Sequence, residues 1–389
     1  MREISIALIG GGFISKAHCL AFRALPGYFP ELSLRITRRV LVETNKETAK
    51  KRAHELGFEK WTTSWKVAIK DQKVNLVDIA TPNYLHKPIA LYAAEHRKNV
   101  FCEKPLANNS ADAREMYEAV EKSRVKHMIG FSFRYSPAVR QIERWVKQDE
   151  LGEIRHFKGI YCQEWGANES APLDWHFQSN TTGSGSLGDI GSHIIDIARS
   201  FVGDIQEVVA FTNTFIKERP LVSGSAFLSA ADNSAISKVE KGQVDVDDSV
   251  FFMARFENGA MGSFVISRVW RGRPNHLSFE INGTKGSVTF DWEKPNEVHL
   301  FSACQPKDKE GFTRVLIGNT AHPYNKNLWP IAGCGVGYVE NYVIEMYQLV
   351  RAIVTGRKID TSFYEGWKTS QVVDAVLKSS KERKWIGIE

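Results

Sequence analysis

The N-terminus of this 389-residue chain places a glycine-rich turn directly between an apolar strand and a helix. The turn, Gly10-x-Gly12-x-x-Ser15, departs from the GxGxxG fingerprint only at its third position. The first glycine permits a tight turn, and the second lets the backbone approach a pyrophosphate at the helix N-terminus. The motif predicts a dinucleotide site, with a glycine-rich turn that holds no ligand as the alternative. The residues expected to bind the dinucleotide here are Gly10, Gly12, Phe13 and Ile14.

The first third of the chain alternates strands and helices. Strands are predicted at residues 36–43, 74–80, 100–102 and 127–133, and helices at 46–56, 86–96 and 110–123. Such alternation is typical of a parallel, doubly wound sheet, whose ligands bind beyond the carboxyl ends of the strands. We therefore expect an α/β N-terminal Rossmann domain over residues 1–133.

The pattern changes after about Phe133. Strands are predicted at 208–216, 249–256, 260–269, 277–281 and 287–290, and helices at 187–202, 338–355 and 366–383. Residues 282–286 carry a hairpin-turn signal, and the polar stretch 223–242 reads as a surface loop. We expect residues 134–389 to form an α+β domain with a large, mainly antiparallel sheet.

Composition excludes several classes of protein. The 51 basic and 45 acidic residues give a mild net charge of +6, without the basic stripe that nucleic-acid binding requires. No apolar run is long enough to span a membrane, and no signal peptide is expected. The five cysteines form no CxxC pair, which favours reduced thiols in a cytoplasm and argues against structural zinc. We expect no bound metal.

An acidic residue at the end of the second strand sets the cofactor preference. Glu43 stands where a carboxylate accepts hydrogen bonds from the adenosine ribose hydroxyls, and it would repel a 2′-phosphate. NAD is therefore favoured over NADP, although Arg38, Arg39 and Lys46 lie close in sequence.

Two further signatures carry acid–base chemistry. Lys104 follows an apolar strand and precedes Pro105, and Asp189 lies one helical turn before His193. A histidine with a pKa near 6.5 can accept a hydroxyl proton, and a partly desolvated lysine can polarise the same hydroxyl. The spacing of Asp189 and His193 equally fits a helix-start carboxylate with a core histidine. For Lys104 the alternative is a solvated lysine in a turn. Thr81, Pro82, Asn83 and His86 are candidates to contact the cofactor, with helix capping by Asn83 as the alternative. Glu103 is expected to brace the cofactor ribose or the loop.

Taken together, these motifs resemble the glucose–fructose oxidoreductase, inositol dehydrogenase and rhizopine-catabolism (Gfo/Idh/MocA) family over nearly the whole chain. The resemblance is carried by residues 8–14, by Ala80-Thr81-Pro82-Asn83 with His86, by residues 102–106 and by residues 188–193. Residues 161–165, 218–221, 244–248, 321–324 and 328–330 are similar to a branch that oxidises anhydrosugars. In that branch an Arg follows the Trp where this chain has Trp175-His176-Phe177.

The resemblance implies an NAD-dependent dehydrogenase that oxidises a secondary hydroxyl of a sugar, anhydrosugar or cyclitol to a keto product. It favours catalytic roles for Lys104, Asp189 and His193, in a cleft between domains, and homodimers or homotetramers built through the C-terminal sheet. Further candidates to line a polyol pocket are Arg134, Gln163, Trp165, Trp175, His176 and His322. Alternatives are an NAD-recycling glycosidase or epimerase, and a non-catalytic NAD-binding regulator.

Overall fold

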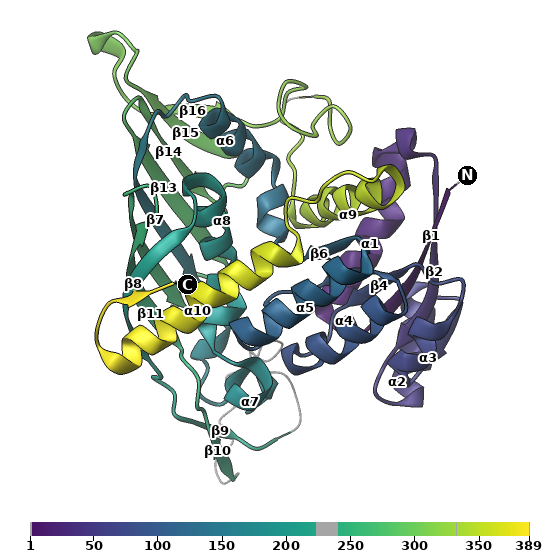
Figure 1. The fold of residues 1–389 in the computed structure, drawn as a ribbon. Helices are drawn as coiled ribbons and strands as arrows, with labels where there is room; N and C mark the ends of the chain where they lie inside the picture. Colours follow the sequence, from purple (N-terminus) through teal and green to yellow (C-terminus); the bar gives the residue numbers. More distant parts are fainter. Residues whose placement is uncertain (1, 223–239, 332, 389) are drawn as a thin grey trace. The chain divides into compact units, whose positions relative to one another are not determined.

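The computed structural model describes residues 2–222, 240–331 and 333–388. The chain divides into two compact units (Figure 1). The first unit comprises Met1–Ser136 and Asn319–Trp367, and the second comprises Pro137–Gly318 and Lys368–Glu389. This division differs from the two continuous domains expected from the sequence, because residues 319–367 pack with the first unit. The surface loop predicted at 223–242 falls largely outside the described residues.

The first unit contains a six-stranded sheet of order β3-β2-β1-β4-β5-β6, in which every neighbouring pair is parallel. This confirms the doubly wound Rossmann arrangement. The strands are β1 (Arg2–Ile9), β2 (Leu34–Val42), β3 (Lys60–Thr62), β4 (Leu76–Ile79), β5 (Asn99–Cys102) and β6 (His127–Ile129).

Helices of the first unit cover the two faces of this sheet. They are α1 (Phe13–Tyr28), α2 (Lys46–Leu56), α3 (Trp65–Lys70), α4 (His86–Glu95), α5 (Ser110–Ser123) and α9 (Tyr338–Thr355). Residues of α3, α4 and α5 share one apolar core with the sheet, and residues of α1 and α9 share another. The predicted bounds of α2 hold because Asn45 caps its start and Gly57, at φ +72°, ends it.

The late helix α9 explains why the first unit is discontinuous. It packs against α1, and at the C-cap of α1 the ring of Phe29 stacks on that of Tyr347 with centroids 3.8 Å apart. Val343 and Ile344 of α9 are fully buried in the same core as Phe22. Burial of this apolar stripe against the Rossmann helices stabilises the unit with residues from far along the chain.

The second unit is built on a nine-stranded sheet of order β16-β15-β14-β13-β7-β12-β11-β8-β17. Only the β7–β12 pair is parallel, so the predicted mainly antiparallel α+β architecture is confirmed. The strands are β7 (Ile154–Cys162), β8 (Ile205–Asn213), β11 (Ser249–Phe256), β12 (Met261–Ser267), β13 (His276–Gly283), β14 (Gly286–Asp291), β15 (Glu297–Ser302), β16 (Thr313–Leu316) and β17 (Ile386–Gly387). A separate ribbon pairs β9 (Glu218–Pro220) with β10 (Lys241–Gln243).

Helices α6 (Pro137–Lys147) and α8 (Ser192–Val202) of the second unit lie on one face of the large sheet (Figure 1). Helix α8 packs on β7 and is preceded by a π-helical turn, Leu187–Gly191. The other helices are the short α7 (Ser179–Thr182) and α10 (Phe363–Glu382), which contains the boundary between the two units.

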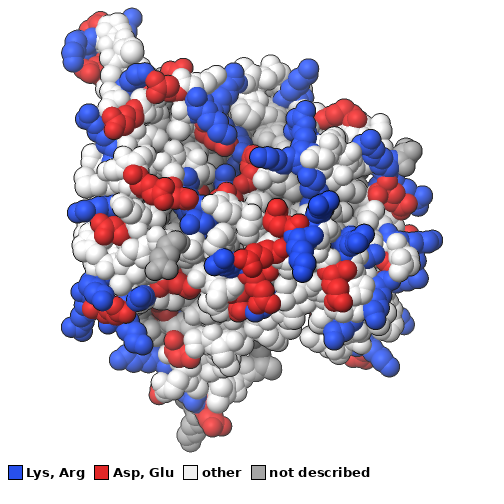
Figure 2. Space-filling view, viewed as in Figure 1, with Lys and Arg blue, Asp and Glu red and all other residues white. Residues whose placement is uncertain are grey.

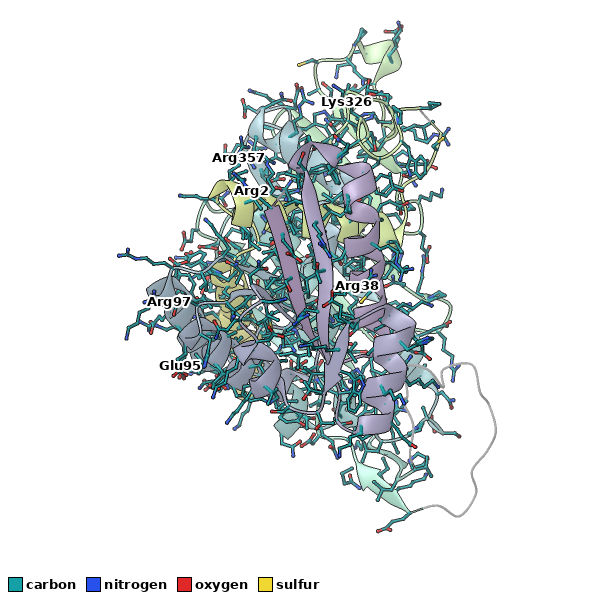
Figure 3. All side chains as sticks on the ribbon, turned by 90° about the vertical axis from the view of Figure 1, so that its right-hand side faces the viewer. Arg2, Arg38, Glu95, Arg97, Lys326 and Arg357 are labelled. Atoms are coloured by element: carbon teal, nitrogen blue, oxygen red, sulfur yellow. The ribbon has the colours of Figure 1, made fainter. Side chains whose placement is uncertain are left out.

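Charges are distributed over the surface without a single basic stripe on the faces in view. Figure 2 shows acidic and basic side chains interspersed. In Figure 3 the labelled Arg2, Arg38, Arg97 and Lys326 lie apart from one another on the first unit. Among the described residues, no helix is long and apolar enough to cross a membrane.

Candidate active site

The glycine turn has the geometry that its sequence predicts. Gly10 has φ +99°, and a Cβ there would lie 2.2 Å from the carbonyl oxygen of Ala80. Gly12 is the N-cap of α1, and a Cβ built on it meets no atom within 4 Å. The helix also has no acidic residue in its first turn. The backbone at Gly12 is therefore open to an approaching pyrophosphate, as a dinucleotide site requires.

The serine at the third motif position has a role of its own. Ser15 is fully buried, and its Oγ donates a 2.9 Å hydrogen bond to the carbonyl oxygen of Gly10. This bond ties the first turn of α1 to the end of β1. Serine at this position therefore stabilises the turn through a hydrogen bond that a glycine could not make.

Glu43 lies immediately after β2, beside the glycine turn. Its Oε1 accepts a hydrogen bond from the Gly11 N–H at 2.8 Å, and its Oε2 accepts one from the Thr44 N–H at 3.0 Å. A carboxylate oxygen has further lone pairs, so these bonds leave Glu43 able to accept from a ribose hydroxyl.

The turn after β4 carries a polar atom that the protein leaves unsatisfied. The Oγ1 of Thr81 is buried and has no hydrogen-bond partner among the described residues. Buried hydroxyls are usually bonded, so an orphan beside the glycine turn fits a site that a cofactor completes. Pro82 is half-buried and Asn83 is buried in the same turn.

His86 joins this turn to the segment that carries Lys104. Its ring is fully buried, with Nδ1 at 2.9 Å from the carbonyl oxygen of Pro105 and Nε2 at 2.9 Å from that of Thr81. Burial lowers the pKa of His86, although both carbonyl groups favour its protonated form. The structure therefore places this candidate as a brace between two loops.

Lys104 is half-buried after β5, and the Lys104–Pro105 peptide is cis. The carboxylate of Glu103 accepts a 3.1 Å hydrogen bond from the Lys104 backbone N–H, and its other oxygen lies 3.1 Å from Nε2 of His18. These contacts favour a role in holding the loop, one of the two that we expected for Glu103.

In the second unit, Asp189 is half-buried in the π-helical turn and His193 is 7% exposed in the first turn of α8. Buried Asp247 holds the start of this segment. Its carboxylate accepts hydrogen bonds from the N–H groups of Gly185 and Leu187, both at 2.8 Å, and from Oγ of Ser186 at 2.7 Å. Asp247 thus acts as a cap for the helix that carries both candidates.

Aromatic and amide side chains of the second unit gather near His193. Its ring lies 6.0 Å from that of Tyr161, centroid to centroid. Gln163 donates through Nε2 to the Tyr161 hydroxyl at 3.1 Å and to Oδ1 of Asn275 at 2.7 Å. Sequence reasoning identified Gln163 but missed Asn275, which lies 112 positions away and has no local motif.

A second cluster contains the remaining candidates of this unit. His176 stacks on Trp175 with centroids 3.8 Å apart and meets Trp165 at 5.4 Å. Its Nδ1 lies 2.9 Å from Oδ1 of Asp174, a partner that the sequence did not single out. Indole faces beside hydrogen-bonding groups suit a polyol, which presents both C–H faces and hydroxyl edges.

The last two candidates, Arg134 and His322, belong to the first unit. Arg134 is 8% exposed, and Nδ1 of half-buried His322 accepts a 3.3 Å hydrogen bond from the Asn319 N–H.

Two family models match the chain. One, described as an oxidoreductase family with an NAD-binding Rossmann fold, matches residues 4–131, and a GFO/IDH/MocA C-terminal domain matches residues 139–289. Levoglucosan dehydrogenase of Pseudarthrobacter phenanthrenivorans is 41% identical over 388 residues, covering 100% of this chain and 99% of that protein. NAD⁺-dependent scyllo-inositol 2-dehydrogenase of Bacillus subtilis is 28% identical over 66% of this chain and 67% of its own.

The solved structures agree with these relatives. The structure of a levoglucosan dehydrogenase in complex with NADH and levoglucosan matches with a TM-score of 0.93 and 40% identity, covering 100% of both chains. The second-unit architecture and the Rossmann unit are therefore both shared with that enzyme.

Proposed function

Since the chain belongs to the Gfo/Idh/MocA family of NAD-binding oxidoreductases, we propose that it oxidises a secondary hydroxyl of an anhydrosugar, with levoglucosan as the substrate to test first. The observation that carries this proposal is the match, over the full length of both chains, to a levoglucosan dehydrogenase holding NADH and levoglucosan. The product would be the corresponding keto sugar.

The cofactor is NAD, and we assign its binding to the first unit. The open backbone at Gly12 would receive the pyrophosphate together with the first turn of α1 at Phe13 and Ile14. Glu43 would accept from the adenosine ribose, and Thr81 with Pro82 and Asn83 would complete the groove. Bound NAD⁺ supplies the acceptor for the substrate hydride.

Acid–base chemistry is assigned to three side chains. His193 would take the proton of the reacting hydroxyl as the hydride leaves the same carbon, and Asp189 would orient the imidazole or bind a neighbouring hydroxyl. Lys104 would polarise the oxygen of the reacting hydroxyl and take part in the relay of the hydroxyl proton. Asp247 supports this assignment, because its hydrogen bonds to the N–H groups of Gly185 and Leu187 fix the start of the segment that carries Asp189 and His193.

Substrate recognition is assigned to Gln163, Trp165, Trp175 and His176, with Arg134 and His322 as further contacts. The pairing of His176 with Asp174 supports its role, since it orients the ring. The anhydrosugar branch carries Arg at this place, so we expect a changed preference among the sugar hydroxyls.

The test is NADH formation, followed by absorbance, with levoglucosan, scyllo-inositol and D-glucose 6-phosphate. Lys104→Ala and His193→Ala should lower kcat on the best substrate at least about a hundredfold and leave NADH affinity nearly unchanged. His299→Ala, on strand β15, is the matched control and should retain activity. Near-normal turnover in both site variants would refute the assignments.

Two alternative activities give different results in the same assay. An NAD-recycling glycosidase or epimerase would consume substrate without accumulating NADH. A regulator would bind NADH, measured by its fluorescence, yet convert none of the sugars. Stoichiometric NADH would exclude both.

We also propose that the protein forms a homodimer or homotetramer through the open face of the nine-stranded sheet. On that face Phe211, Met253 and Met261 are 65%, 56% and 55% exposed, and Phe211 stacks on Phe251 at 5.4 Å. A second copy would bury these apolar groups. Light scattering coupled to size exclusion tests this, and Met253→Glu should shift the protein towards monomer. The five free cysteines support a reducing compartment such as the cytoplasm.

A further inference from the structure

His18 lies between two carboxylates in the core of the first unit. It is on α1 and fully buried. Its Nδ1 lies 3.1 Å from both carboxylate oxygens of Asp78 on β4, and its Nε2 lies 3.1 Å from Oε1 of Glu103. Three segments of the Rossmann unit therefore meet at one imidazole ring.

Between two ionised carboxylates, this geometry requires protons on both ring nitrogens. A neutral imidazole donates from only one nitrogen, so its other nitrogen would face a carboxylate oxygen lone pair to lone pair. An imidazolium donates to both Asp78 and Glu103 and removes that repulsion.

The electrostatics agree with a charged ring. Burial alone would lower the pKa of His18, but Asp78 and Glu103 more than offset it and raise the pKa to about 10. The other titratable groups whose pKa values respond to these carboxylates are Cys19 of α1, His86 of α4, Cys102 of β5, and Tyr338 and Tyr342 of α9. Burial raises the pKa of both cysteines and both tyrosines and lowers the pKa of His86, so all five stay neutral.

Glu103 transmits the position of His18 to the lysine. While Oε1 faces His18, Oε2 accepts the hydrogen bond from the Lys104 N–H at 3.1 Å. Gly130 packs closely here, since a Cβ on it would lie 2.7 Å from Oε1 of Glu103. The carboxylate thus has little room to move, and the Lys104 backbone is fixed with it.

We propose that His18, as an imidazolium, is a positioning residue that fixes Lys104 through Glu103, with Asp78 holding the far side of the ring. The same helix begins at the cofactor turn, so α1 connects the open backbone at Gly12 to the segment of the reacting lysine. This inference rests on the role of Lys104 in the proposed function. A purely structural role would instead make His18 a stabilising core group that leaves the chemistry of folded protein unchanged.

The principal variant is His18→Gln, whose side-chain amide can satisfy only one of the two carboxylates. The double variant His18→Gln/Asp78→Asn restores complementarity, because the Asn amide can donate to the Gln oxygen while the Gln amide donates to Glu103. We expect His18→Gln to lower kcat on levoglucosan at least about tenfold, since a small misplacement of a reacting group can lower the reaction rate up to ~100-fold. The double variant should recover most of this loss, and NADH affinity should change little in both. His54→Gln, exposed on α2, is the control.

Two spectroscopic readouts work whether or not levoglucosan is turned over. In protein with ¹³C-labelled histidine, the Cε1 signal of His18 should keep its imidazolium shift up to pH 9. In protein with ¹⁵N-labelled lysine, the Lys104 amide, identified by its loss in Lys104→Arg, should shift in His18→Gln and return in the double variant.

These measurements distinguish a failure of the proposed function from a failure of the role assigned to His18. If wild-type protein oxidises no sugar but both signals behave as expected, the proposed function fails and the fixing of Lys104 by His18 stands. The inference is overturned if His18 titrates near its ordinary pKa, or if His18→Gln leaves the Lys104 amide unshifted. It is also overturned if His18→Gln lowers only the melting temperature, with normal kcat in folded protein.

Discussion

The carboxylate of Glu43 accepts a 2.8 Å hydrogen bond from the backbone N–H of Gly11. A negative charge at the end of β2 is thereby fixed against the middle residue of the glycine turn. A Cβ on Gly11 would lie 2.9 Å from the same oxygen, so the glycine is needed for this approach. One side chain thus both shapes the cofactor turn and sets its charge.

Replacing Glu43 with Ala should weaken NADH binding at least about tenfold, the equivalent of ~1.4 kcal/mol. The reason is the loss of the bond to Gly11 and of an acceptor for the ribose, while the barrier to a 2′-phosphate disappears. Fluorescence titration with NADH and NADPH measures this, and the affinity ratio should move towards NADPH. Glu47→Gln, an exposed acid on α2, is the control. Equal losses for both cofactors would disprove the ribose contact.

Gly12→Ala should weaken cofactor binding without destabilising the fold. Gly12 has φ −75°, which alanine adopts readily, and its Cβ would meet no protein atom within 4 Å. The melting temperature should therefore stay close to that of wild type, while NADH affinity falls because the methyl group occupies the path of the pyrophosphate. Gly10→Ala is the contrasting variant: with φ +99° and a 2.2 Å clash at Ala80, it should lower the melting temperature as well. An unchanged NADH affinity in Gly12→Ala would place the pyrophosphate elsewhere.

Local signals explain which parts of the fold could be predicted from sequence. The bounds of α2, α5 and α9 were predicted correctly, since α2 and α5 begin at asparagine caps and α9 ends at Gly356. Strand β3 and helix α3 were missed, because they are only three and six residues long. Strand β7 was missed because Arg155, His156 and Lys158 interrupt its apolar pattern, although it lies in the centre of the sheet.

The residues of the candidate site likewise fall into those with a local sequence signal and those whose contacts are tertiary. Glu43 and the glycines could be proposed from sequence because each stands at the end of a strand with a local signal, and the structure brings Glu43 to Gly11. Asn275 and Asp247 were not assigned a site role, since each acts on a partner more than 50 positions away. The bridging role of His86 and the contact of His18 with Glu103 are likewise tertiary, and no periodicity or spacing encodes them.

Removing the Asp247 carboxylate should destabilise the second unit. Asp247→Ala leaves the donors at Gly185, Ser186 and Leu187 without their acceptor, and Asp247 is only 6% exposed. Unsatisfied buried donors cost about 1–3 kcal/mol each, so a loss of ~3 kcal/mol or more in unfolding free energy is expected. Denaturant titration measures it. Asp245→Ala, which removes an exposed acceptor for Ser179, should cost less than about 1 kcal/mol. Equal effects of the two variants would contradict the capping role.

The loss of protein stability at low pH should depend on Glu143 of α6. Burial would raise the pKa of this carboxyl, but Arg140 at 2.6 Å and Lys147 at 2.7 Å lower it from 4.5 to about 2. Because the folded-state pKa lies below the unfolded value, the carboxylate contributes its full stabilisation above about pH 4.5 and loses it as the pH falls towards 2. At neutral pH Glu143→Gln should therefore cost ~3 kcal/mol, from 1.4 kcal/mol per pKa unit, and the difference from wild type should shrink between pH 4.5 and 2. Thermal unfolding across this range measures the difference, with the exposed Glu150→Gln as the control. A wild-type advantage that does not change with pH would show that the ion pairs of Glu143 do not set its titration.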